Sequence, residues 1–454
     1  MERRLDLESD VVSPMTKFSF RFRLAVGCLL VVIAVATYAW VHQLRNGLRV
    51  TGLHSPVFWG IYITNFVFFI GISHAGTLIS AILRLCQAEW RRPITRIAEA
   101  ITVLVLFVGA GNIIMDLGRP DRALNVILHP NFRSPLLWDV TSITAYLTVS
   151  TLYLYVPLIP DIALLRDRLP RRRWIYRPLA LGWKDTPRQR WWLERLIAVL
   201  AVIVIPIAVS VHTVVSWVFA MTVQPMWHST IFGPYFVVGA IFSGIAALIV
   251  VMAVLRKVYY LEAYIKRVHF NNLGILLLVM ACLWLYFTLA EYITTFYGHE
   301  PEEMVIFWAK LSGPYAPLFW SMAVCCFLVP FIVLANPRTR TISGTVVASS
   351  FVLVGMWLER YIIVVPSLAN PRLPLPRGVY SPTWVEWAIT AGAFAAFFLL
   401  YCLFAKIFPI LSIWEMREGQ ERGIQDTVER LKTYLPAVEP QPHALTRGVG
   451  GLAR

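Results

Sequence analysis

The stretch VFWGIYITNFVFFIGISHAGTLISAILR (residues 57–84) decides the class of this protein. It contains no acidic side chain, and its one arginine, Arg84, comes at its very end. A helix needs about 20 consecutive apolar residues to cross the hydrocarbon core of a bilayer, where the backbone finds no other hydrogen-bond partners. The stretch therefore predicts a membrane-spanning α-helix with the ionisable residue His74 near its middle.

Nine more runs of this kind lie along the chain, at 24–43, 97–116, 136–158, 195–220, 234–255, 271–296, 315–335, 344–365 and 384–411. They are continuous rather than alternating, which excludes strands of the outer-membrane type. The composition agrees, because 58% of the 454 residues are hydrophobic and only 15% are charged. The sequence predicts an all-α integral membrane protein with ten transmembrane helices.

The net charge of +15 gathers in alternate loops rather than in a nucleic-acid-binding patch. The loops at 84–96, 159–194 and 256–270 are rich in Arg and Lys, whereas 221–233 has no charge and 297–314 is mostly acidic. Basic loops face the cytoplasm. We therefore expect both termini in the cytoplasm. We expect a multi-pass protein of the bacterial cytoplasmic (inner) membrane, surrounded by lipids and not bound to nucleic acid.

An internal repeat divides the spans. SPLLWD at 134–139 resembles APLFWS at 316–321, and an even number of spans separates them, so the two units share one orientation. We predict a first four-helix bundle at 57–220 and a second at 234–365. A cytoplasmic segment (1–23), the helices at 24–43 and 384–411, and a cytoplasmic tail (412–454) complete the chain.

Ionisable side chains inside spans cost a few kcal/mol each on insertion scales, so each is a functional candidate. Most of them fall in the outer half of the membrane, which favours a polar site near the outer face. On the fourth helix Asp139, Ser142 and Tyr146 share one face at helical spacing. The hydroxyls either relay protons or bond back to their own helix, and Asp139 either serves the site or is solvated at the helix end.

We expect the site itself at His74 and Asp139. Candidates for its mouth are Asp116, Arg119, Arg133 and His228, and candidates for a proton path are Ser142, Tyr146, His212, Glu291, Glu359 and Arg360. The alternatives are that Glu359 and Arg360 neutralise each other and that His212 is a packing residue.

The residues favour a site without a resident metal or redox cofactor. The six cysteines form no C-x-x-C or C-x-x-C-H motif, so we expect no iron–sulfur cluster, zinc site or c-type haem. We place His74 and His212 at different depths, which disfavours a b-type haem between them. Quinol suits the remaining groups, because its hydroxyls can bond to a carboxylate and an imidazole while its ring packs on aromatic side chains.

Two motifs carry a family resemblance. GISHAGTLISAILRL (71–85) and NFRSPLLWD (131–139) resemble the NrfD-type polysulfide reductase membrane subunits. Within that family, SVHTVVSWVFAMTVQPMWHSTIFGPYFVVGAIFSG (210–244) and GMWLERYIIVVPSL (355–368) are most similar to the ActC type of alternative complex III. The resemblance covers the second to the ninth span.

The resemblance implies a quinol-binding subunit without haem or iron–sulfur cluster that takes menaquinol or ubiquinol at His74 and Asp139. It implies electron transfer to an iron–sulfur subunit on the outer face, further membrane and c-type cytochrome subunits, and proton translocation. A quinone-reducing subunit of a polysulfide-reductase-like or hydrogenase-like complex, a secondary transporter and a structural anchor are the alternatives.

Overall fold

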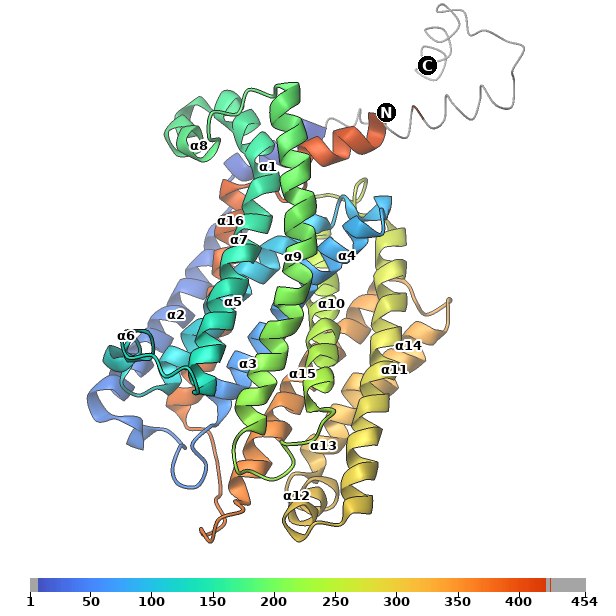
Figure 1. The fold of residues 1–454 in the computed structure, drawn as a ribbon. Helices are drawn as coiled ribbons and strands as arrows, with labels where there is room; N and C mark the ends of the chain where they lie inside the picture. The colour runs from blue at the N-terminus through green and yellow to red at the C-terminus, as the bar shows by residue number, and fades with distance from the viewer. Residues whose placement is uncertain (1–6, 422–424, 426–454) are drawn as a thin grey trace, which may run out of the picture.

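A computed structural model describes residues 7–421 and 425 of the chain (Figure 1). Within these residues the regular structure is helical, and extended pairing is limited to one isolated bridge between His54 and Val57. Ten helices of this described part are long and apolar enough to cross a membrane. The predicted all-α class and the predicted number of spans are confirmed.

The spans follow the predicted order. They are α2 (Phe20–Asn46), α3 with α4 (Ile61–Leu85), α5 (Thr95–Asp116), α7 (Pro135–Arg168), α9 (Pro187–Ala220), α10 (Phe232–Val258), α11 (Arg267–Gly298), α13 with α14 (Ala316–Ala335), α15 (Ile342–Ala369) and α16 (Trp384–Ile407). Four short helices connect or flank them: α1 (Leu7–Thr16), α6 (Asn125–Leu128), α8 (Arg173–Leu179) and α12 (Pro301–Leu311). Helices α7 and α9 are longer than the predicted 136–158 and 195–220, because both continue as polar helix beyond the apolar run.

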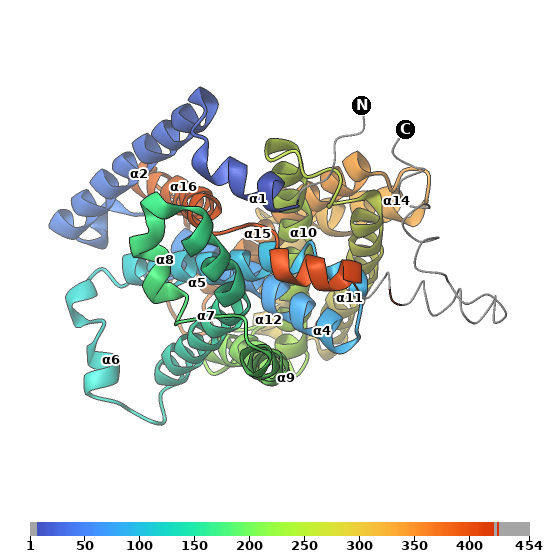
Figure 2. The ribbon, with the colours of Figure 1, turned by 90° about the horizontal axis from the view of Figure 1, so that it is seen from above.

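Eight of the spans pack as two rings of four helices. Helices α3, α5, α7 and α9 close the first ring, and α10, α11, α13 with α14, and α15 close the second. Helix α10 packs against α3 and α9 and so joins the rings, which lie side by side in the view along the helices (Figure 2). We call these rings the first and the second bundle.

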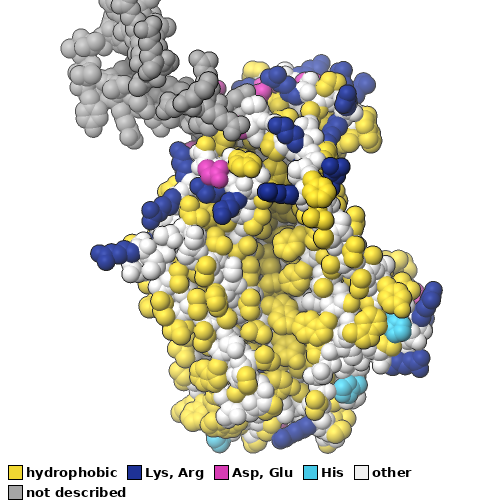
Figure 3. Space-filling view, turned by 180° about the vertical axis from the view of Figure 1, so that it is seen from behind, with side chains coloured by type: hydrophobic (Ala, Val, Ile, Leu, Met, Phe, Trp, Pro, Cys, Tyr) yellow, Lys and Arg dark blue, Asp and Glu magenta, His cyan; other side chains and the backbone are white. Residues whose placement is uncertain are grey.

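Helices α2 and α16 pack against each other at the edge of the first bundle. From that side the surface is largely hydrophobic and hollowed along its middle (Figure 3). A groove there is lined by apolar and aromatic side chains of α3, α10, α15 and α16, including Phe68, Trp357 and Phe394. Such a surface suits contact with lipid tails.

Arginines gather at one end of the bundles, which we call the inner end after the positive-inside expectation. There Glu415, in a helical segment at 413–421, forms ion pairs with Arg84 and Arg91. Burial alone would raise the pKa of the Glu415 carboxyl, but the two guanidinium groups hold it below its usual range. Arg96 and Asp161 form a second buried pair between α5 and α7. The Glu415 pairs, together with the backbone N–H groups of Ile413 and Trp414 that donate to Asp161, fasten the start of the C-terminal tail to the first bundle. The rest of the tail, beyond 421, lies almost wholly outside the described residues.

The second span is not a regular α-helix throughout. Helix α3 (Ile61–His74) passes through a π-helical turn (Ala75–Ile79) into α4 (Ser80–Leu85). A side chain at Gly76 would come within 1.9 Å of the Ala98 carbonyl oxygen on α5, so only glycine permits this close packing. Single π turns inside α-helices occur frequently at functional sites, and this one begins directly after His74.

Candidate functional site

His74 is fully buried at the centre of the first bundle. Its Nε2 lies 2.6 Å from the carbonyl oxygen of Ala208 on α9, and its Nδ1 lies 3.1 Å from that of Ile70. A neutral imidazole can donate to one of these carbonyls and a protonated ring can donate to both. The backbone around His74 therefore accommodates either protonation state.

His212 lies against His74. The two rings meet edge to face with centroids 3.8 Å apart, so the prediction that they lie at different depths is wrong. The physical reason is that α9 runs over 34 residues, far more than a membrane requires, and the depth of His212 cannot be counted from the edge of the apolar run. Rings in direct contact leave no room for a porphyrin between them. Within the described chain neither nitrogen of His212 has a hydrogen-bond partner.

Hydroxyl groups surround the His74 ring. The Tyr146 ring lies 5.2 Å from it, and the Tyr146 hydroxyl shares a 2.6 Å hydrogen bond with Thr77 Oγ1 and donates to the Ser73 carbonyl. Thr102 on α5 donates to the same carbonyl at 2.6 Å. Tyr146, a predicted member of the proton path, is thus placed directly beside His74.

The polar contacts continue towards the inner end. One turn after Thr77, Ser80 donates to the carboxylate of Glu99 at 2.7 Å and lies 3.2 Å from the Tyr153 hydroxyl. These residues were not predicted from the sequence. The sequence does carry a signal for them, because polar residues recur every three positions on two successive spans: His74, Thr77 and Ser80 on one, Glu99 and Thr102 on the next. This signal is easily missed, since small hydroxyl residues are common in membrane helices.

Asp139 enters the first bundle from the outer end, in the second turn of α7. It is 8% exposed, and its buried Oδ1 has no hydrogen-bond partner among the described residues. Ser142 donates to the backbone carbonyl of Asp139 at 3.0 Å, so its hydroxyl bonds back to its own helix. Seven residues separate Asp139 from Tyr146, a rise of about 10 Å along the helix. Asp139 and Tyr146 therefore lie at different depths on the same face of α7.

The predicted mouth residues separate into two places. Asp116 ends α5, and its Oδ1 is likewise buried without a partner in the part of the chain described. Arg119, paired with Asp121 at 3.0 Å, and Arg133 are exposed in the connection between α5 and α7. His228 instead lies 3.4 Å from Glu303 on α12, beside the second bundle.

Glu291, Glu359 and Arg360 all belong to helices of the second bundle. The Arg360 guanidinium nevertheless lies beside Gly71 on α3, close enough for its charge to act on His74 and His212. The adjacent pair predicted from the sequence forms, with 2.9 Å between Arg360 Nη1 and Glu359 Oε2. Trp284 donates to the other oxygen of Glu359 at 2.7 Å. Glu291 and Glu359 line a cavity of the second bundle, whose lining residues do not include Asp139.

One group of side chains has the composition of a metal site. Ligand atoms of His228, Glu300 and Glu303 lie within 4.8 Å of one another at the outer surface, and no metal was expected from the sequence. Exposed acidic groups of this kind are common without an ion. The described residues thus offer one surface cluster and no internal one.

Comparison with known proteins finds several similar membrane subunits. A protein of Halobacterium salinarum described as a membrane subunit of dimethyl sulfoxide reductase is 26% identical over 410 residues, 85% of this chain and 91% of that protein. The Hdr-like menaquinol oxidoreductase integral membrane subunit of Archaeoglobus fulgidus is 23% identical over 437 residues, 90% of this chain and 97% of that protein. The menaquinone reductase integral membrane subunit of Nitratidesulfovibrio vulgaris is 23% identical over 413 residues, 86% and 92% of the two chains.

These names cover several kinds of reductase and oxidoreductase, so the similarity does not single out the ActC type. The family model described as polysulphide reductase, NrfD, matches residues 49–371, which hold both bundles. This stretch is more than half of the chain and includes His74, Asp139 and His212. The chain is a multi-pass membrane protein that belongs to the NrfD polysulphide reductase family.

Proposed function

We propose that this chain is the quinol-binding membrane subunit of an electron-transfer complex, with its site in the outer half of the first bundle. One observation carries the proposal. The Asp139 carboxylate on α7 and the His212 imidazole on the neighbouring helix α9 are both buried, and among the described residues Asp139 Oδ1 and both His212 nitrogens have no hydrogen-bond partner. Buried polar groups are normally hydrogen-bonded. A ligand with an oxygen at each end of a ring can satisfy both.

In the proposed reaction a quinol loses two electrons and two protons. Asp139 accepts a proton from the outer hydroxyl, while His212 accepts the proton of the inner hydroxyl on one of its nitrogens, which have no partner in the described chain. His74, held by the carbonyls of Ile70 and Ala208, packs its ring against His212 and keeps it in position. The hydroxyls of Tyr146 and Thr77, and beyond them Ser80, lie in the direction of Glu99 and support the proposal that protons are translocated along this line.

The electrons leave one at a time to an iron–sulfur subunit docked at the outer face, in a complex with further membrane and c-type cytochrome subunits. Menaquinol is the substrate that the names of two relatives favour. We propose the ActC type of alternative complex III in a bacterial cytoplasmic membrane, on the motifs at 210–244 and 355–368. The second candidate is a reductase complex that uses the same site in the opposite direction, which the menaquinone reductase relative favours.

The test is quinol-driven electron transfer by the purified complex carrying Asp139→Asn, at matched assembly of the complex and across pH. We expect at least a ten-fold loss of turnover, because asparagine keeps the shape but cannot accept the proton. Thr144→Val on the exposed side of α7 is the matched control, since Thr144 bonds only back to its own helix at Val140 in the described chain. Full turnover in the Asn variant would refute the assignment of Asp139.

A further inference from the structure

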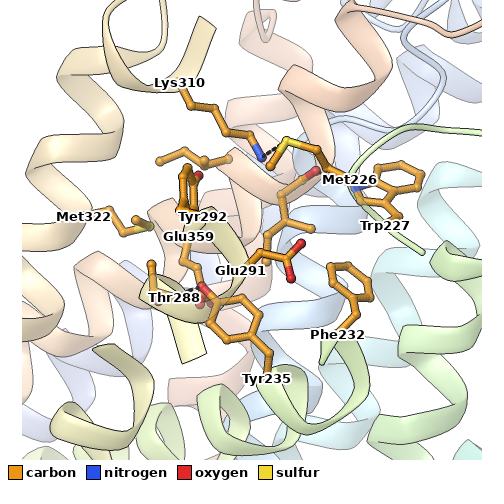
Figure 4. A pocket seen from close by; sticks show the side chains of 12 residues that line it. Met226, Trp227, Phe232, Tyr235, Thr288, Glu291, Tyr292, Lys310, Met322 and Glu359 are labelled. Carbon is orange, nitrogen blue, oxygen red and sulfur yellow. Dashed lines mark hydrogen bonds between the residues drawn. The ribbon is translucent and has the colours of Figure 1, made fainter. Parts of the chain in front are cut away.

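A cavity in the second bundle holds charged groups that the proposed site does not use. It has about 40 Å³ of room for water-sized molecules, within about 460 Å³ of unfilled space that includes its open mouth, and lies among α10, α11, α12, α13 and α15 (Figure 4). Lys310, Glu291 and Tyr235 enter it from three different helices. Its other walls are mainly aromatic side chains and methionines.

Lys310 is buried without a strong acceptor. It is 5% exposed, and in the described chain its hydrogen-bond partner is the thioether sulfur of Met226, 3.9 Å from Nζ. A thioether is a weak acceptor, and an ammonium group offers three donors. Burying such a charge is costly unless oxygen acceptors replace the lost water. The cavity therefore lacks an oxygen in front of Lys310.

Glu291 lacks a hydrogen-bond donor, as Lys310 lacks a strong acceptor. It is 9% exposed, and its Oε2 finds no hydrogen-bond partner within the described residues. It is within electrostatic reach of Lys310, yet no direct ion pair joins the two among the residues described. Figure 4 shows the Lys310 ammonium beside Met226 at one end and the Glu291 carboxylate pointing into the space between. A ligand that spans the two charges needs an acceptor at one end and a donor at the other.

Two other polar side chains of the cavity have partners. Glu359 accepts from Trp284 and lies in an ion pair with Arg360, and the Trp227 indole donates to the Ile363 carbonyl at 2.9 Å. The walls also present ring faces, from Trp227, Phe232, Tyr235 and Tyr292, and the two tyrosines add hydroxyl groups. A ring needs more room than the cavity offers in this conformation, so Met226 and Met322 must move to admit it, as the flexible side chain of methionine allows.

The internal repeat relates this cavity to the first bundle. Helix α13 opens with APLFWS as α7 opens with SPLLWD, so Ser321 takes the place of Asp139 and the next residue, Met322, lines the cavity. The acid is supplied instead by Glu291 on α11. The second bundle thus carries its own acid-bearing cavity in its outer half, as the first bundle carries Asp139.

We propose that this cavity is a second binding site for a quinol head group, with one ring oxygen accepting from Lys310 and the opposite hydroxyl donating to Glu291. The choice of ligand class rests on the proposed function. The site binds the ring between the aromatic walls and takes no part in its oxidation.

The experiment counts binding sites for the fluorescent quinol analogue 2-heptyl-4-hydroxyquinoline N-oxide, whose fluorescence is quenched when it binds, in the purified complex. We expect Lys310→Met and the cavity-filling Met322→Trp each to lower the number of bound analogues by one, or the affinity of one class at least ten-fold. Lys257→Met, on an exposed inner-end lysine, is the matched control. The two cavity variants act by different means, so one remains informative if the other assembles poorly.

Asp139→Leu separates this inference from the proposed function, because leucine removes the oxygen that the ligand of the first site bonds to. If both hold, the Asp139→Leu variant loses a different analogue and the double variant with Lys310→Met loses two. If Lys310→Met and Met322→Trp leave every class of site unchanged, the second site is refuted, whatever Asp139→Leu does. A loss in the Lys310 variant together with no change in the Asp139→Leu variant would support the second site and refute the first.

Discussion

The imidazole rings of His74 and His212 meet edge to face, with their centroids 3.8 Å apart, between α3 and α9. The two histidines differ in what they bond to. His74 places both nitrogens on backbone carbonyls, whereas His212 leaves both unpartnered in the described chain. His74 is therefore fixed in place by the fold, and His212 is the group that a ligand can reach with a hydrogen bond.

Replacing His212 with leucine tests whether His212, and not His74, bonds to the ligand. We expect the thermal unfolding midpoint of the ligand-free complex to rise, because each buried polar group without a partner costs about 1–3 kcal/mol. We expect quinol-driven turnover to fall at least ten-fold in the same variant. Ser210→Ala on the exposed side of α9 is the control. A variant that is more stable and fully active would make His212 a packing residue.

Tyr146→Phe interrupts the hydroxyl chain beside His74. The variant removes the hydrogen bonds to Thr77 and to the Ser73 carbonyl, yet Thr102 still donates to that carbonyl at 2.6 Å. The stability loss should therefore be limited to about 1 kcal/mol.

If the hydroxyl groups of Tyr146 and Thr77 relay protons, turnover of the Tyr146→Phe variant falls about ten-fold while the affinity for the quinol analogue stays unchanged. Tyr155→Phe, near the inner end of the same helix, serves as control. Equal losses of turnover and affinity would instead indicate a binding role for the Tyr146 hydroxyl.

The sequence predicted the class of fold well because its signal is simple. Hydrocarbon demands long apolar helices, and the ten runs match the helices to within a few residues at most ends. The ends that failed are the inner ends of α7 and α9, where polar helix continues beyond the membrane. Loop charges indicate a topology but do not say where such a helix stops.

The candidate site was only partly predictable. Asp139 and Tyr146 were placed on one inward face by helical spacing, and the structure keeps both buried. The contact between His74 and His212 was missed because it depends on the relative shift of two helices, which periodicity within one helix does not report. Lys310 was missed because α12 lies outside the spans, and a lysine in an outer loop ordinarily reaches water.

Glu415→Gln tests the attachment of the tail to the inner end. The change leaves Arg84 and Arg91 without their buried carboxylate, so we expect the free energy of unfolding to fall by about 3 kcal/mol. Asp185→Asn breaks an exposed pair with Arg190 and should cost less than about 1 kcal/mol. Thermal unfolding of the two variants at pH 7 gives the comparison.

The pH dependence of the Glu415 effect follows from its depressed pKa. A lowered carboxyl pKa means that the contribution is fully present above the ordinary value of 4.5 and is lost as the pH falls below it. The difference between native protein and Glu415→Gln should therefore shrink below about pH 4.5. A difference that is small already at pH 7 would show that the ion pairs with Arg84 and Arg91 contribute little.

Lys310 predicts a second pH dependence with the opposite sense. Burial lowers the pKa of its ammonium group to about 8, against the opposing charge of Glu291. Below this pH Lys310 carries the proton that the ligand oxygen accepts, and above it the lysine is neutral, so affinity at the second site should fall as the pH rises through about 8. His228 and Glu303 act electrostatically on Glu291, and Glu359, which is paired with Arg360, lines the same cavity. Titrating the quinol analogue from pH 6.5 to 9.5, in native complex and in Lys310→Met, isolates the lysine. The difference in affinity between native complex and Lys310→Met should disappear over the upper half of this range. If the difference persists unchanged at the highest pH, the effect comes from the shape of the lysine side chain and not from its charge.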